Sequence, residues 1–411
     1  MAEPLSNPAV ARPWLAIVGI GEDGRAGLTP PAFQALEKAE LVVGGARHLA
    51  LAQPILVRTL TWPSPLSNAY PEILAQRGRP VCVLATGDPF HYGVGAELAR
   101  LVAPGEFVSY PQPSAFSLAA ARLGWSLPDC ACISVHGRAL KRMLPLLQPG
   151  GKILALSWDG TTPARIASLL AEHGFGGSGL IVLERMGGPR ERIRSSLAED
   201  FDLGDIDPLN TVAIEVAAGV STQLISLAPG LDDSWFENDG QLTKAEIRAL
   251  TLAALAPRRG ERLWDVGAGA GSVAIEWMLR SPANRATAVE ARPDRADRIA
   301  RNARHLGVPD LQVAVGTAPE ALASLPEPDA IFIGGGASDR RVFETCWAAL
   351  PHGGRLVVNA VTIETEAVLA GLFGAHGGSL KRIGISRAAP VGGMQGWRPA
   401  MPVTQWAVTK P

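Results

Sequence analysis

The sequence has little charge of either sign and no long hydrophobic run. Charged residues make up 19% of its 411 residues and the net charge is −1, so no overall basic surface for nucleic acid is expected. No apolar run approaches the ~18 residues that a membrane helix needs. Residues 1–13 are polar and contain proline, unlike a secretion signal. We therefore expect a cytoplasmic protein with no membrane or nucleic-acid partner.

The sequence also lacks the usual metal-binding and disulfide patterns. Its four cysteines include no C-x-x-C pair, and no two histidines stand at zinc-ligand spacing. Cys130 and Cys132 allow a redox or metal pair, but small residues entering a strand are the favoured interpretation. The sequence thus predicts no metal site. Because 47% of the residues are hydrophobic, the chain can bury large cores.

Two α/β stretches are separated by a poorly periodic one, which predicts a domain over residues 1–216, a linker over 217–236 and a domain over 237–411. In the first domain, short apolar runs alternate with helical patterns. The predicted strands are 15–19, 41–45, 81–86, 107–110, 131–135, 152–157, 180–184 and 211–216. The predicted helices are 29–39, 95–101, 114–123 and 163–173.

The second domain alternates more regularly, which predicts a doubly wound parallel sheet of Rossmann-like type. Helix 244–255 comes first. The strands 262–266, 286–290, 311–315, 330–333 and 355–361 then alternate with the helices 272–280, 294–306, 318–324, 339–350 and 363–375. Two late runs, 381–386 and 403–409, predict a closing antiparallel pair.

A glycine-rich turn follows the first predicted strand of this sheet. Residues 265–271 read Asp-Val-Gly-Ala-Gly-Ala-Gly, and Glu290 ends the next strand. Residues without a Cβ let the backbone approach a ligand, and the helix N-terminus that follows favours an anion. An acid at Glu290 can accept hydrogen bonds from two ribose hydroxyls. The turn fits NAD, FAD or S-adenosylmethionine, but its spacing departs from G-x-G-x-x-G and so favours S-adenosylmethionine.

Three further segments follow the later strands at the same edge of the sheet: 316–320, 331–336 and 359–364. With residues 241–248 and the glycine turn, they resemble the CbiT-type decarboxylating precorrin methyltransferases over nearly all of 237–411. The resemblance implies a cofactor site, and the end of the fifth strand offers Asn359 and Thr362 as catalytic candidates. The implied cofactor contacts are Thr243, Gly267, Ala268, Gly269, Ala270, Gly271, Glu290 and Ala318.

The first domain carries a second set of motifs. Gly19-Ile20-Gly21 ends its first strand, and residues 87–93, 113–117 and 134–138 follow in order. Together they resemble the CbiE branch of the tetrapyrrole methyltransferases, which implies an S-adenosylmethionine site between two α/β lobes. His91 and His136 are candidate bases or turn residues bonded to backbone. The implied cofactor contacts are Gly21, Gly87, Asp88, Gly93 and Ser114.

The two halves together resemble the fused CobL-type enzymes of cobalamin synthesis. That resemblance implies methylation of the tetrapyrrole precorrin-6B at carbons 5 and 15, decarboxylation of its ring C acetate, and precorrin-8 as product. It also implies a homo-oligomer. Because the macrocycle carries many carboxylates, basic side chains should line the cleft. The candidates in the second domain are Lys244, Arg387 and Arg398.

Two alternatives stay open. One is an RNA methyltransferase fused to an inactive partner, for which the arginine-rich helix 294–306 would supply a basic face. Pairs such as Asp294 with Arg298 and Asp297 with Arg301 instead favour a solvated helix surface. The other alternative is a cofactor-binding scaffold without turnover. The sequence does not say whether the substrate carries cobalt.

Overall fold

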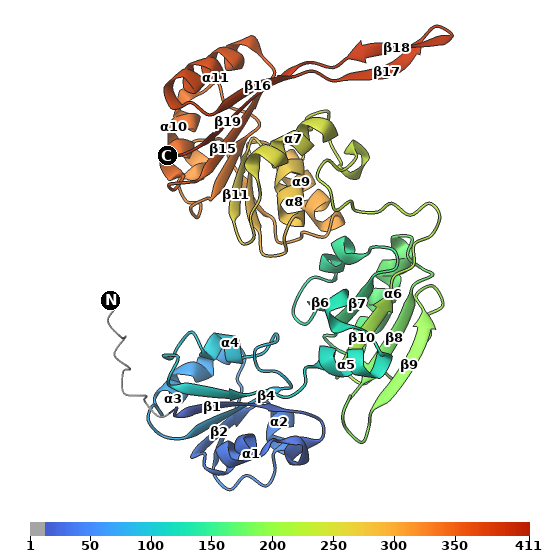
Figure 1. The fold of residues 1–411 in the computed structure, drawn as a ribbon, viewed down its shortest axis with the longest axis vertical. Helices are drawn as coiled ribbons and strands as arrows, with labels where there is room; N and C mark the ends of the chain where they lie inside the picture. Colours follow the sequence, from blue (N-terminus) through green and yellow to red (C-terminus); the bar gives the residue numbers. More distant parts are fainter. Residues whose placement is uncertain (1–12) are drawn as a thin grey trace, which may run out of the picture. The chain divides into compact units, whose positions relative to one another are not determined.

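The computed structural model describes residues 13–411 (Figure 1). They divide into two compact units: the first runs to Arg138 and resumes over Gln148–Gln223, and the second contains Ala139–Leu147 and Leu224–Pro411. The polar N-terminal segment noted above lies, apart from Pro13, outside the described residues. Within residues 13–411, no helix is both long and apolar enough to cross a membrane. The same residues contain no cluster of metal-ligating side chains.

The first unit begins with a five-stranded parallel lobe in the order β3-β2-β4-β1-β5. Successive residues of β1 face opposite sides of the sheet, so Ile17 packs into one hydrophobic cluster and Val18 into another. Both faces of the sheet are therefore covered. The elements are β1 (Leu15–Ile20), α1 (Pro30–Glu37), β2 (Leu41–Gly44), α2 (Ala46–Leu51), β3 (Arg58–Thr61), α3 (Tyr70–Leu74), β4 (Val81–Thr86), α4 (Gly95–Leu98) and β5 (Phe107–Tyr110).

The second lobe of this unit has a mixed sheet in the order β6-β7-β10-β8-β9, in which β6 and β7 pair in parallel and the other pairs are antiparallel. Helix α5 packs on one face through Phe116 and Ala119. The elements are α5 (Ala115–Leu123), β6 (Cys130–Ser134), β7 (Lys152–Leu156), α6 (Thr162–Glu172), β8 (Gly179–Glu184), β9 (Arg192–Leu197) and β10 (Asn210–Glu215).

Each strand predicted in the first half is present, within one or two residues. The sequence missed β3 and β9, which are edge strands. Their residues are largely exposed and polar, so they show no apolar alternation. It also missed the short helices α2 and α3. Helix α4 is shorter than the predicted 95–101.

The second unit is built on a seven-stranded sheet in the order β13-β12-β11-β14-β15-β19-β16. Its first five strands are parallel, and β19 runs antiparallel between β15 and β16. The strands are β11 (Arg262–Val266), β12 (Arg285–Glu290), β13 (Gln312–Val315), β14 (Ala330–Ile333), β15 (Arg355–Ala360), β16 (Ser379–Ile383) and β19 (Val403–Thr409). The helices are α7 (Ala245–Leu255), α8 (Ser272–Leu279), α9 (Pro293–His305), α10 (Arg340–Ala349) and α11 (Ile363–His376).

The Rossmann-like architecture and the closing antiparallel pair are confirmed, the pair being β16 and β19. The predicted helix 318–324 is wrong: within these residues the chain forms one short 3-10 turn, Glu320–Leu322. The sequence also missed a hairpin, β17 (Ser386–Val391) and β18 (Met394–Pro399). In Figure 1 this red ribbon extends beyond the sheet.

The segment before α7 is attached to the second unit by buried charges. Glu276 on α8 accepts backbone N–H bonds from Gly230 at 2.7 Å and Leu231 at 2.9 Å. It also pairs with Arg248 on α7 at 2.5 Å, and both side chains are fully buried. Arg248 donates in turn to the carbonyl oxygens of Leu231 and Thr243. Residues 230–243 are thereby held beside the edge of the sheet where the glycine turn lies.

Candidate active sites

The second unit contains a cavity of about 660 Å³ at the carboxyl ends of its parallel strands. Ligands in open α/β sheets bind at this edge. The lining includes residues that follow β11, β12, β13, β14 and β15, together with residues 240–244, 246 and 247. The predicted site residues among them are Thr243, Gly267, Ala268, Gly269, Glu290, Ala318 and Asn359.

The first residues of the glycine turn face the cavity, and its last residue serves the packing of two helices. Gly267 has φ +70°, and a Cβ there would lie 2.8 Å from the backbone of Gly335. Gly269 has φ +60°, so both positions require glycine. Ala270 and Gly271 do not line the cavity. Gly271 instead lets α8 approach α9, because a Cβ there would meet Ile299 at 2.6 Å.

Glu290 stands beside this turn at the end of β12 and is almost buried. Its Oε2 accepts the N–H of Gly269 at 2.9 Å, and its Oε1 accepts the N–H of Arg292 at 3.1 Å. Each carboxylate oxygen can accept at least one further bond. Glu290 therefore fits the two hydroxyls of a ribose while its own position is fixed by backbone.

Asp265 lies at the end of β11 beneath the glycine turn and is 1% exposed. Its Oδ2 accepts the N–H of Ala274 at 3.0 Å, whereas its Oδ1 is buried without a hydrogen-bond partner. Burial raises the pKa of this carboxyl to about 7, the Ala274 bond opposes the shift, and the nearby Glu290 adds to it. A proton on Asp265 is therefore available near neutral pH.

Asn359 at the end of β15 belongs to a buried amide–hydroxyl network. Its Nδ2 donates to Thr251 Oγ1 at 2.9 Å, and its Oδ1 accepts from Gln405 Nε2 at 3.1 Å. Thr251 donates to the carbonyl oxygen of Ile247 at 2.8 Å. The other catalytic candidate, Thr362, is exposed and caps helix α11 by accepting the N–H of Thr365, and it is not part of the cavity lining.

Basic side chains stand at the rim of the cavity, and each has an acidic neighbour. Lys244 lies 3.3 Å from Asp233, and Arg387 contacts Glu246 at 2.5 Å. Both Lys244 and Arg387 line the cavity, whereas Arg398 lies opposite Arg387 in the hairpin and does not.

The arginines of α9 pair differently from the prediction. Arg301 pairs with Glu237 at 2.7 Å, and Arg298 lies 3.3 Å from Asp239. These acids come from the segment before α7. Asp294 and Asp297 still act electrostatically on Arg298 and Arg301, but among the described residues they form no ion pair with them. Contacts with a distant segment replace the local pairs because that segment crosses the helix.

The first unit contains a second cavity, of about 670 Å³, lined by residues of both lobes. Gly21, Gly87, Gly93 and Ser114 line it as predicted, but Asp88 does not. Asp88 closes a turn by accepting the N–H of Phe90 at 2.8 Å. Gly87 has φ +54°, and a Cβ there would lie 2.7 Å from the carbonyl oxygen of Pro113.

Both candidate histidines of this domain line the second cavity. The His91 ring lies 4.7 Å from that of Phe116, and the His136 ring lies 5.7 Å from that of Trp158. Aromatic packing thus sets their positions. A third histidine, His48, also lines the cavity, and its Nε2 is hydrogen-bonded to Thr86 Oγ1 at 2.8 Å. Burial, with a smaller contribution from Arg47, lowers the pKa of His48 to about 4.

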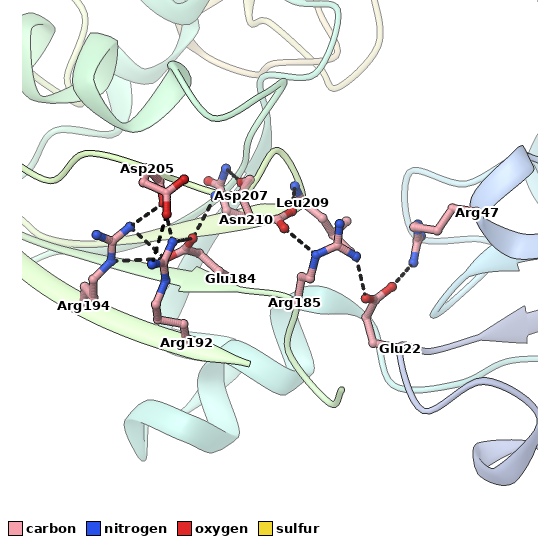
Figure 2. A network of polar contacts seen from close by, with 10 residues as sticks. All are labelled: Glu22, Arg47, Glu184, Arg185, Arg192, Arg194, Asp205, Asp207, Leu209 and Asn210. Atoms are coloured by element: carbon pink, nitrogen blue, oxygen red, sulfur yellow. Dashed lines mark hydrogen bonds and ion pairs between the residues drawn. The ribbon is translucent and has the colours of Figure 1, made fainter. Parts of the chain in front are cut away.

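A polar network joins the two lobes along this cavity (Figure 2). Glu22, from the loop after β1, contacts Arg47 of α2 and accepts from Arg185 Nη1 at 2.9 Å. Arg185, which follows β8, also pairs with Asp207. Arg47 donates to Thr86 Oγ1 at 2.7 Å. The two lobes therefore share one carboxylate between two guanidinium groups.

Comparison with known proteins identifies both halves. A family model described as tetrapyrrole (corrin/porphyrin) methylases matches residues 15–202, and one described as a precorrin methyltransferase domain matches residues 234–410. A Sinorhizobium sp. protein named precorrin-6Y C(5,15)-methyltransferase [decarboxylating] is 54% identical over 406 residues, which are 98% of each chain. The chain belongs to this family. Its methyl donor is S-adenosylmethionine, and both resemblances are confirmed.

Two relatives of the precorrin-6Y methyltransferase family cover only part of the chain. A Saccharolobus solfataricus protein, a probable cobalt-precorrin-6B C(15)-methyltransferase (decarboxylating), is 35% identical over 33% of this chain and 72% of its own. A Salmonella typhimurium cobalt-precorrin-7 C(5)-methyltransferase is 28% identical over 47% of this chain and 96% of its own. These relatives do not support an RNA methyltransferase fused to an inactive partner.

Sequence reasoning missed the residues that support the two sites of this family member. Arg47 and His48 lie in the first turn of α2, just beyond β2, and a basic pair soon after a strand was the available signal. Thr251 and Gln405 had no signal in the sequence, because their hydrogen bonds to Asn359 depend on the order of strands in the sheet. Glu22 and Arg185 are 163 residues apart, and each looks like an ordinary surface charge.

Proposed function

We propose that this chain methylates precorrin-6B at carbons 5 and 15, removes carbon dioxide from its ring C acetate, and yields precorrin-8. One observation carries the proposal: a single chain holds two cavities of similar size, each beside glycines that admit no side chain. A full-length relative named for both methylations supports it. The relatives with cobalt in their names are the partial ones, so we assign a metal-free substrate to this chain.

We assign carbon 15 and the decarboxylation to residues 237–411, and carbon 5 to residues 1–216, with 217–236 as the linker. One part-length relative is named for carbon 5 of cobalt-precorrin-7, whereas the other is named as a probable enzyme for carbon 15 of cobalt-precorrin-6B. The order that follows is methylation and decarboxylation at carbon 15 first. Carbon 5 is then methylated on the product of that step.

At the carbon 15 site, the chain mainly binds and orients. S-adenosylmethionine, when bound, supplies an already activated methyl group. Gly267, Ala268 and Gly269 offer a backbone surface for it, Glu290 holds the ribose, and Thr243 and Ala318 border the same space. Asn359 orients the acceptor macrocycle. Correct placement is enough, because well-oriented reactants gain effective molarities of ~10⁵–10⁸ M.

Residues 334–336 leave room for a wide planar acceptor, because they are three successive glycines at the end of β14. Lys244 and Arg387 at the rim bind its carboxylates, with Arg398 nearby on the hairpin. The decarboxylation needs an electron sink, and a protonated ring imine of the macrocycle provides one. The protein then has to hold the acetate in place and exclude water.

We further propose that the enzyme is a cytoplasmic homo-oligomer that binds no nucleic acid. The described cysteines are all free thiols, as expected in a reducing compartment. The β17–β18 ribbon exposes Met394 and Trp397, each 77% exposed, which favours burial against a second copy of the chain. Light scattering after gel filtration tests the oligomer: Trp397→Ser should lower the molar mass. A gel shift with tRNA tests the absence of nucleic-acid binding.

Product mass spectrometry on the intact chain tests the reaction. With metal-free precorrin-6B and S-adenosylmethionine, we expect two added methyl groups and one lost carbon dioxide. Gly87→Val, which crowds the carbon 5 site, should stop after one methyl group and the loss of carbon dioxide. Glu290→Ala should act on precorrin-7 but not on precorrin-6B. Bound cofactor without any mass change in intact substrate would contradict the proposal and support a scaffold.

A further inference from the structure

The cavity of the first unit has a strongly basic wall. Its lining includes Arg47, Arg138 and Arg185, and the single acidic side chain in the same lining is Glu22. His48 adds no charge at neutral pH, because its pKa is lowered to about 4. Asp207 pairs with Arg185 from outside the lining, so three cations stand against two anions and one positive charge is left unbalanced. The proposed acceptor, a polyanionic macrocycle, is methylated in this cavity.

Arg47 and Arg185 are held close together by the carboxylate that they share. Glu22 has its side chain 10% exposed and takes one guanidinium on each oxygen. Arg47 comes from the first lobe and Arg185 from the second, as Figure 2 shows. The pair is thus fixed in position before any ligand arrives, which reduces the entropy lost on binding.

Both guanidinium groups keep unused donors. Arginine has five N–H donors. Arg47 uses its two terminal nitrogens on Glu22 and Thr86, and Arg185 uses one terminal nitrogen on Glu22 and its Nε on Asp207. Each group therefore retains N–H bonds for a second carboxylate.

Arg138 completes the wall from the loop that follows β6 in the second lobe. Its guanidinium lies over the ring of Tyr92, 5.2 Å from the ring centre, and Tyr92 lines the same cavity. Within residues 13–411, Arg138 forms no ion pair, so its charge is not balanced by a neighbouring carboxylate. An exposed arginine fixed over an aromatic ring can bind an anion without losing an existing salt bridge.

We propose that Arg47, Arg185 and Arg138 form a binding site for carboxylate side chains of the tetrapyrrole in the carbon 5 cavity, and so fix which edge of the macrocycle enters. This rests on the proposed function. The cofactor also has a carboxylate, but it carries a sulfonium and an ammonium as well and is a cation overall. An excess of positive charge therefore suits the acceptor and opposes the cofactor.

Arg192, which is also drawn in Figure 2, offers a matched control variant. Arg192 on β9 pairs with the buried Glu184 at 2.6 Å, but it does not line the cavity. Arg192→Gln removes a comparable ion pair from the same lobe. Any loss shared by Arg185→Gln and Arg192→Gln therefore reports on folding, and a loss confined to Arg185→Gln reports on the ligand.

The first experiment measures equilibrium binding to the intact chain. Uroporphyrin III, which carries acetate and propionate groups, is titrated by fluorescence, and S-adenosylhomocysteine by calorimetry. Arg47→Gln, Arg185→Gln and Arg138→Gln should each weaken one class of uroporphyrin site about tenfold, the size expected for a lost charge-assisted hydrogen bond. Uroporphyrin octamethyl ester should bind wild type and variants alike. Arg138→Gln breaks no ion pair and keeps the test valid if another variant unfolds.

Unchanged uroporphyrin affinity in all three variants would overturn the proposal, and so would an equal loss of uroporphyrin affinity in Arg192→Gln. A fall in S-adenosylhomocysteine affinity instead would also overturn it, because it would assign the arginines to the cofactor. The binding assay needs no turnover, so it separates this site from the proposed reaction. Where the wild type methylates precorrin-7, the same variants should raise the KM for precorrin-7 and leave kcat nearly unchanged.

Discussion

Asn359 and Gln405 lie directly opposite each other on the antiparallel strands β15 and β19, and their side-chain amides are hydrogen-bonded at 3.1 Å. The direction of this bond is determined by helix α7. Thr251 has one hydroxyl hydrogen and gives it to the carbonyl of Ile247, so its oxygen can only accept. Asn359 must then turn its NH2 toward Thr251 and its oxygen toward Gln405.

Thr251→Val tests this arrangement, because valine has nearly the same shape and cannot accept a hydrogen bond. The amide of Asn359 loses its fixed orientation, so kcat for carbon 15 methylation and decarboxylation should fall about tenfold, as for one lost hydrogen bond. S-adenosylhomocysteine affinity should not change. Thr251→Ser keeps the hydroxyl and should restore kcat. Equal losses in both variants would show that Thr251 serves packing alone.

Glu290→Ala should weaken cofactor binding in the second domain only. The variant loses the acceptor for ribose and leaves the N–H groups of Gly269 and Arg292 unpaired. Calorimetry with S-adenosylhomocysteine should show one of two sites weakened about a hundredfold, as for two charge-assisted hydrogen bonds. Glu344→Ala, which alters an exposed pair with Arg340 on α10, is the control. Unchanged affinity and stoichiometry in Glu290→Ala would rule the role out.

The sequence predicted the parts of the fold in which near neighbours carry the signal. The turn at 265–271 and the acid at 290 each end a strand, and adjacent parallel strands bring such ends together. The Thr251–Gln405 contact spans 154 residues and depends on β19 lying between β15 and β16. The hairpin at 386–399 is mostly exposed on both faces, so neither a core pattern nor a helix pattern marks it. The Thr251–Gln405 contact could not be predicted because it joins residues far apart in the sequence. The hairpin could not be predicted because its exposed residues carry no hydrophobic pattern.

Asp265 should make the stability of the second unit depend on pH. Its pKa in the folded protein is about 7, above the ordinary value of about 3.9. The stability that this group contributes is thus complete below pH ~4 and is lost as the pH rises through ~7, at up to ~1.4 kcal/mol per pH unit. Asp265→Asn stays neutral. Urea titrations should show the variant gaining stability relative to wild type over this range.

Above pH ~8, both the folded and the unfolded wild type have lost the Asp265 proton, so the difference between variant and wild type should level off. A difference that stays constant between pH ~4 and ~8 would show that the buried carboxyl titrates normally. The unfolding transition of the second unit is the one that saturating S-adenosylhomocysteine raises in the wild type but raises less in Glu290→Ala, because a ligand raises the stability of the unit that binds it.

The residues before α7 should decide whether the second unit is stable by itself. A fragment that begins at residue 237 lacks the Gly230 and Leu231 N–H groups that Glu276 accepts, and it lacks the Leu231 carbonyl that Arg248 binds. Both charges are fully buried, so the loss of their partners should cost several kcal/mol. Calorimetry should therefore show a clearly lower Tm for 237–411 than for 224–411. Extending the fragment to 217–411 is the control and should add nothing, because residues before Leu224 belong to the first unit. Equal Tm values for 237–411 and 224–411 would show that Glu276 and Arg248 satisfy each other without this segment.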